Sequence, residues 1–100
     1  MIPKREMGNT GINLSLIGLG GWQLFDINNE KESLSIIDNA IEMGINFCET
    51  ACYYGQSEAI IAKCLKNSHS DSLVVSTKCG KNKNGQFDIS PKHINCSKDN

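Results

Sequence analysis

Short segments typical of β-strands alternate along this chain with longer segments of helical periodicity. Three segments have the composition of buried strands, namely residues 16–19, 45–50 and 73–77. Helical segments over residues 29–44 and 57–65 separate them, and Ser90-Pro91 supplies the N-cap and first-turn proline of a third helix. Alternating strands and helices predict an α/β fold with a parallel sheet and right-handed crossovers.

The two complete helical segments carry clear end signals and apolar faces. Asn29, with Glu32 three residues later, forms a capping-box pattern, and Gly44 is well placed to end the first helix. The apolar faces consist of Leu34, Ile37, Ala40 and Ile41 in the first helix and Ile60, Ile61, Cys64 and Leu65 in the second. Such stripes predict helices that pack one side against the sheet.

A β-hairpin is predicted before the first parallel strand. Residues 3–7 and 12–14 flank Gly8-Asn9-Thr10-Gly11, whose glycines and asparagine tolerate the positive φ angles of tight turns.

Two parallel architectures fit this order of elements, an open doubly wound sheet and a (β/α)8 barrel. The dinucleotide-binding fingerprint of the open sheet requires G-x-G-x-x-G at its first turn. Gly18 and Gly20 are present, but Gln23 occupies the third glycine position, so the pattern fails. A complete barrel needs about 250 residues. A chain of 100 residues could therefore contain only the first third of such a barrel.

Charge and composition exclude several classes of function. Ten basic and eleven acidic residues give a net charge of −1, which offers no electrostatic basis for binding nucleic acid or an anionic membrane. No segment approaches the ~18 apolar residues of a membrane span, and residues 4–11 are unlike a signal peptide. The sequence thus predicts a cytoplasmic protein.

The five cysteines are expected to be reduced and metal-free. Cys48 and Cys52 have C-x3-C spacing, but no second pair of ligands follows. Zinc and iron–sulfur sites are therefore not predicted, and small buried thiols are the default interpretation.

Four collinear blocks resemble the aldo-keto reductases: "MGNTGINLSLIGLGGW" from Met7, "GINFCETACYYGQSE" from Gly44, "STKCG" from Ser76 and "SPKHI" from Ser90. The resemblance covers almost the whole chain. It implies a TIM barrel closed at the bottom by a hairpin, of which this chain would form the hairpin and the first three β/α units. It also implies NADPH-dependent reduction of aldehydes and ketones to alcohols.

The resemblance also implies a set of site residues. The family's catalytic aspartate, tyrosine and lysine match Glu49, Tyr54 and Lys78. The residues expected to border the small-molecule carbonyl substrate and the nicotinamide are Gly20, Gly21 and Trp22, together with Glu49. Tyr53 is expected to be a packing neighbour.

The chemistry of carbonyl reduction explains why a tyrosine, a lysine and a carboxylate would be needed together. Reduction of a carbonyl places negative charge on its oxygen, so the site needs a proton donor aimed there. A tyrosine with a pKa near 10 becomes an effective donor when a cation such as Lys78 lies beside it. Glu49 would hold the Lys78 ammonium in place, and parallel strands bring such side chains together at one end.

The chain departs from the family pattern in three places. Glu49 replaces an aspartate, and Cys52 occupies a position where the family often has another acid. Neither His69, before the third strand, nor His93, in the last helix, is suited to the role of the catalytic histidine.

We therefore expect a truncated reductase that is inactive alone. Two alternatives are a non-catalytic interaction module derived from the barrel, which an ordered partner or self-association would favour, and a small doubly wound binding domain. Self-association through exposed sheet edges is also expected of the chain.

Overall fold

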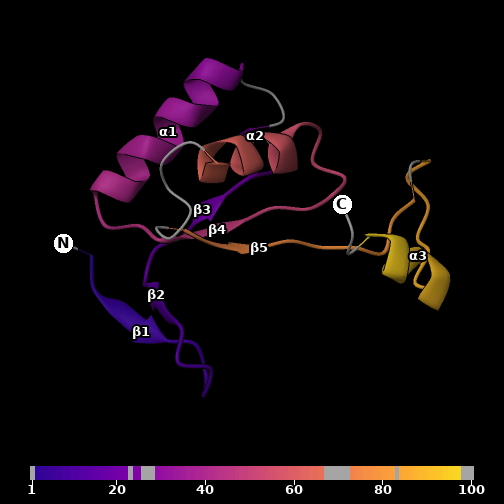
Figure 1. Ribbon diagram of the computed structural model, residues 1–100, viewed down its shortest axis with the longest axis horizontal. Helices are drawn as coiled ribbons and strands as arrows, with labels where there is room; N and C mark the ends of the chain where they lie inside the picture. Colours follow the sequence, from indigo (N-terminus) through magenta and orange to yellow (C-terminus); the bar gives the residue numbers. More distant parts are fainter. Residues whose placement is uncertain (1, 23, 26–28, 67–72, 83, 98–100) are drawn as a thin grey trace.

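The computed structural model describes residues 2–22, 24–25, 29–66, 73–82 and 84–97, with side chains omitted for residues 95–97. Gln23 and His69, which entered the sequence interpretation, lie outside the described residues. Figure 1 shows a two-stranded hairpin on one side of a small parallel sheet, two helices on the other side, and a third helix apart from both.

The hairpin consists of β1 (Lys4–Glu6) and β2 (Asn13–Ser15), paired antiparallel with Arg5 opposite Leu14. Gly8 and Gly11 have φ angles of 56° and 76° in its turn, as the sequence predicted. The Thr10 hydroxyl donates to the Met7 carbonyl at 2.6 Å and closes the turn.

The second sheet is parallel and has the order β3 (Leu19–Gly20), β4 (Phe47–Glu49) and β5 (Val74–Ser76). Its register places Cys48 opposite both Leu19 and Val75. The α/β class and the parallel pairing are confirmed. The described residues form these two separate sheets and no closed barrel.

The first predicted parallel strand is misplaced in the sequence interpretation. Leu16 and Ile17 are 59% and 58% exposed and precede β3, so the run 16–19 is not a buried strand. The Ser15 hydroxyl donates to the Ile17 carbonyl at 2.6 Å, and this local bond turns the chain before pairing with β4 begins.

Helices α1 (Glu30–Glu42) and α2 (Ser57–Cys64) cover the same face of the sheet (Figure 1). The Asn29 side chain accepts from the Glu32 amide at 2.8 Å, which confirms the predicted N-cap. Gly44 ends the first helix with a φ of 97°. In α3 (Pro91–Ser97), the Ser90 hydroxyl accepts from the His93 amide at 3.3 Å, which confirms Ser90 as its cap.

The core lies between these two helices and the sheet. Its buried members are Phe25, Ile37, Cys48, Ile60, Ile61 and Cys64. Burial, with a further contribution from the Glu49 carboxylate, raises the pKa of the Cys48 thiol to about 12. Cys52 and Cys79 are exposed, so the expectation of a buried thiol was wrong at Cys52, which follows the strand.

Asn46 fastens the hairpin to the parallel sheet. Its side-chain oxygen accepts from the Ser15 amide at 2.7 Å, and its side-chain nitrogen donates to the Asn13 carbonyl at 2.9 Å. The Ser15 hydroxyl accepts from the Asn46 amide at 3.1 Å.

No helix among the described residues is long and apolar enough to cross a membrane.

Candidate active site

The candidate site lies where β3, β4 and β5 end, at the carboxyl edge of the parallel sheet. Glu49 is the last residue of β4 and stands opposite Gly20 and Ser76 in the neighbouring strands. Since parallel strands end at a common edge, residues just beyond them from distant parts of the sequence come together there. The Thr50 amide extends the pairing by donating to the Ser76 carbonyl at 2.7 Å.

Lys78 makes its charged contacts with the end of β4. Its ammonium forms an ion pair with the Glu49 carboxylate and donates to the Thr50 carbonyl at 3.1 Å. The hydrogen bond that the ammonium donates to the Glu49 carboxylate is the main cause that raises the pKa of Lys78. Partial desolvation opposes this effect, and the Tyr54 phenol adds to it. Lys78 is therefore held as a cation in a defined position.

Tyr54 is half-buried beside this cation. The Lys78 nitrogen lies 4.9 Å from the centroid of the Tyr54 ring, within the range of cation–π attraction. The ring of Tyr53 meets that of Tyr54 edge-on, with centroids 5.3 Å apart. The structure thus brings Glu49, Tyr54 and Lys78 together, with Tyr53 as the packing neighbour of Tyr54.

Gly20, Gly21 and Trp22 follow the neighbouring strand end. The Gly21 amide donates to the Glu49 carbonyl at 2.9 Å, which brings this segment against β4. Gly20 is exposed, with open space where a side chain would begin, whereas Gly21 is buried and a Cβ there would approach the Ser57 hydroxyl to 2.7 Å. Trp22 is 64% exposed.

His93 makes a contact in another part of the chain. Its ring Nε2 lies 3.0 Å from the Lys81 carbonyl oxygen, in the loop that precedes α3. The Lys81 ammonium in turn lies 4.6 Å from the centroid of the Tyr53 ring and 5.1 Å from that of Phe87. The sequence did not predict that Lys81 links the loop of Tyr53 to the loop of Phe87. A contact between a cation and an aromatic ring depends on the tertiary fold.

Thr50 and Ser57 were also missed as site residues. Their hydroxyl oxygens lie 2.6 Å apart and both side chains are buried, one at each end of the loop that carries Tyr54. In the sequence they look like ordinary polar residues at a strand end and a helix start.

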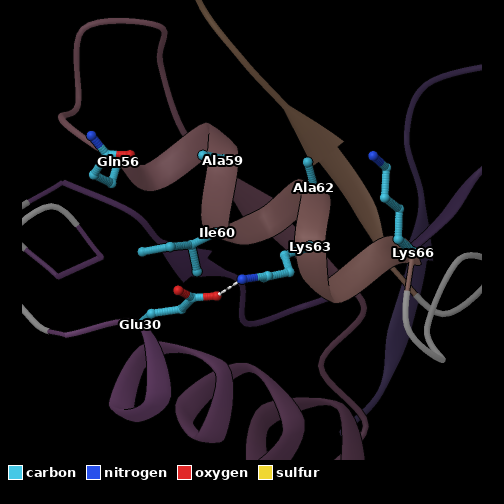
Figure 2. Close-up of a pocket in the computed structure, with 7 residues that line it drawn as sticks. All are labelled: Glu30, Gln56, Ala59, Ile60, Ala62, Lys63 and Lys66. Carbon is cyan, nitrogen blue, oxygen red and sulfur yellow. Dashed lines mark hydrogen bonds and ion pairs between the residues drawn. The ribbon is translucent and has the colours of Figure 1, made fainter.

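A surface groove of about 530 Å³ lies between α1 and α2 and is separate from this cluster. Figure 2 shows the Glu30–Lys63 ion pair across it, with both side chains about half exposed. The residues that line it are Glu30, Gln56, Ala59, Ile60, Ala62, Lys63 and Lys66. Among the described side chains, no group of three or more acids, histidines or cysteines could hold a metal ion.

A carboxylate, an ammonium and a phenol at the carboxyl ends of parallel strands are suited to acid–base chemistry. Comparison with known proteins identifies the class, since the model of the Aldo/keto reductase family matches residues 16–99. The chain belongs to this oxidoreductase family, as its sequence motifs indicated.

Individual relatives agree with this assignment. The chain is 35% identical to L-galactose dehydrogenase of Arabidopsis thaliana over 98% of its length and 33% of that protein. It is 38% identical to the NADH-specific methylglyoxal reductase of Escherichia coli over 79% of its length and 27% of that protein. The holo form of aldo-keto reductase AKR11C1 from Bacillus halodurans superposes with a TM-score of 0.76 at 25% identity, covering 94% of this chain and 33% of that one. The chain thus spans about a quarter to a third of the relatives' length.

Proposed function

We propose that this chain forms the hairpin and first three β/α units of an aldo-keto reductase barrel that reduces aldehydes or ketones to alcohols with NADPH. The observation that carries the proposal is the convergence of Glu49, Tyr54 and Lys78 at one edge of the parallel sheet. The non-catalytic module is less favoured, because the family's acid, tyrosine and lysine positions are all occupied by groups able to play their parts.

In this proposal Tyr54 donates the proton to the carbonyl oxygen of the substrate. Lys78 stabilises the phenolate that remains, because its positive charge lies against the Tyr54 ring. Glu49 and the Thr50 carbonyl position the Lys78 ammonium. These residues act as one unit, so loss of Tyr54 or Lys78 removes the acid function rather than weakening it.

The residues at the end of β3 fit a nicotinamide cofactor. Gly20 leaves open space beside Glu49, and the charge of Lys78 faces the same strand ends. Gly20, Gly21, Trp22 and Glu49 would hold the nicotinamide, which supplies the hydride when bound. We propose NADPH, and the name of the Escherichia coli relative makes NADH the competitor to test.

The test is a chimera in which residues 1–100 replace the matching segment of a reductase relative. Loss of reduced-nicotinamide absorbance is measured with an aromatic aldehyde and either NADPH or NADH. Tyr54→Phe should abolish reduction, since the ring remains while the proton donor is lost, and Tyr53→Phe is the matched control that should stay active. Glu49→Asp should keep or raise the rate. Full activity of the Tyr54→Phe chimera would refute the assignment of roles.

A further inference from the structure

The loop that carries Tyr54 is closed by a buried pair of hydroxyl groups. The Thr50 Oγ1 and Ser57 Oγ atoms lie 2.6 Å apart, and the two residues are 1% and 0% exposed. Each hydroxyl satisfies the other away from water, so removing one leaves a buried polar group without its partner.

Tyr54 is bonded to the main chain on both sides within this closed loop. Its amide donates to the Ala51 carbonyl at 3.1 Å, and its carbonyl accepts from the Ser57 amide at 2.9 Å. Gly55 has a φ of 52°, which allows the chain to turn directly after the tyrosine. The hydroxyl pair therefore joins the two ends of a turn whose hydrogen bonds include the proposed proton donor.

Thr50 also connects this pair to Lys78. Its side chain faces Ser57 at the start of α2, while its carbonyl accepts from the Lys78 ammonium and its amide donates to the Ser76 carbonyl. A displacement of Thr50 would thus move one of the acceptors that hold the ammonium. Gly21 packs on the same pair, since a Cβ there would lie 2.7 Å from the Ser57 Oγ atom.

We infer that Thr50 and Ser57 are positioning residues, whose buried hydroxyl pair sets the Tyr54 loop and, through the Thr50 carbonyl, the place of the Lys78 ammonium. The inference deepens the proposed function, on which it rests for the role of Lys78. A hydroxyl pair of purely structural importance would affect stability and leave the environment of Lys78 unchanged.

The experiment measures the acetylation rate of Lys78 by acetic anhydride in the 100-residue chain, with exposed Lys4 as internal reference. Acetylation requires the free amine, so a lysine held as a cation reacts slowly. In Thr50→Val, which keeps the shape and removes the hydroxyl, we expect Lys78 to react at least about threefold faster relative to Lys4. A decrease of half a unit in the pKa of Lys78 increases its free-amine fraction by about this factor. Thr50→Ser, which keeps the hydroxyl, should react like the wild type.

The double variant Thr50→Val/Ser57→Ala separates position from stability. It leaves neither hydroxyl unpaired, so it should melt at a higher temperature than Ser57→Ala alone while Lys78 still reacts faster. Wild-type reactivity of Lys78 in the double variant would overturn the inference, even if Thr50→Val alone fails to fold. No reduction is measured, so altered Lys78 reactivity together with an inactive chimera would refute the proposed function alone.

Discussion

The carboxylate of Glu49, at the end of β4, forms an ion pair with the ammonium of Lys78, which follows it by 29 positions. This contact is the geometric centre of the candidate site, since it joins the ends of β4 and β5 beside the Tyr54 ring. Its presence shows that Glu49, one methylene longer than the aspartate that the family resemblance implies there, reaches the ammonium of Lys78.

Glu49→Gln should reduce stability in a pH-dependent way. The folded state raises the pKa of Lys78, so this contribution is complete below the ordinary lysine pKa of about 10.4 and is lost as pH rises through the folded-state value. We expect the difference in urea midpoint between the variant and the wild type to shrink above pH ~10.4. Glu30→Gln, which breaks the exposed pair with Lys63, is the control and should cost less than about 1 kcal/mol. An unchanged difference across this range would contradict the assignment to Lys78.

The 100-residue chain alone should not oxidise NADPH with simple aldehydes above background. Tyr54 and Lys78 are in place, whereas His93 contacts the Lys81 carbonyl in the loop before α3, and we expect that it does not orient the carbonyl of the substrate. Orientation contributes up to ~7–11 kcal/mol to lowering a barrier, and its loss alone would suppress turnover. The measurement is loss of NADPH absorbance at high protein concentration, with the chimera as positive control. Robust turnover by the chain alone would contradict this prediction.

We propose that the isolated chain self-associates. The outer edges of β3 and β5 carry no further strand among the described residues. Several large apolar side chains are also exposed, among them Trp22, Phe87 and Ile89 at 64%, 82% and 78%. Unpaired edges and apolar surface favour association between copies. Size-exclusion chromatography over a range of concentrations tests this, and a concentration-independent monomer with a sharp melt would count against it.

Asn46→Ala should loosen the hairpin from the sheet. The substitution removes the acceptor of the Ser15 amide and the donor to the Asn13 carbonyl, at an expected cost of about 1–3 kcal/mol. Asn39→Ala, on the exposed face of α1, is the matched control and should have little effect. Hydrogen exchange at the Ser15 amide reports the change locally, and wild-type protection there in the variant would show that Asn46 does not hold the hairpin.

Local signals in the sequence predicted most of the fold. The cap at Asn29, the left-handed Gly44 and the hairpin glycines depend on neighbours a few residues away, and the structure confirms them. The family motifs predicted that Glu49, Tyr54 and Lys78 lie together, because each residue lies at or after the end of a strand and parallel strands end at a common edge. The structure brings the three side chains together.

The tertiary structure decided what depends on burial and on distant partners. The sequence alone does not distinguish exposed Leu16 and Ile17 from a buried strand, because their exposure depends on where pairing with β4 begins. It equally gives no sign that Thr50 and Ser57 bury their hydroxyls together. The residue types are the same whether a hydroxyl faces water or another hydroxyl. Here the start of α2 places Ser57 against Thr50, just after β4, and this packing excludes water from the pair.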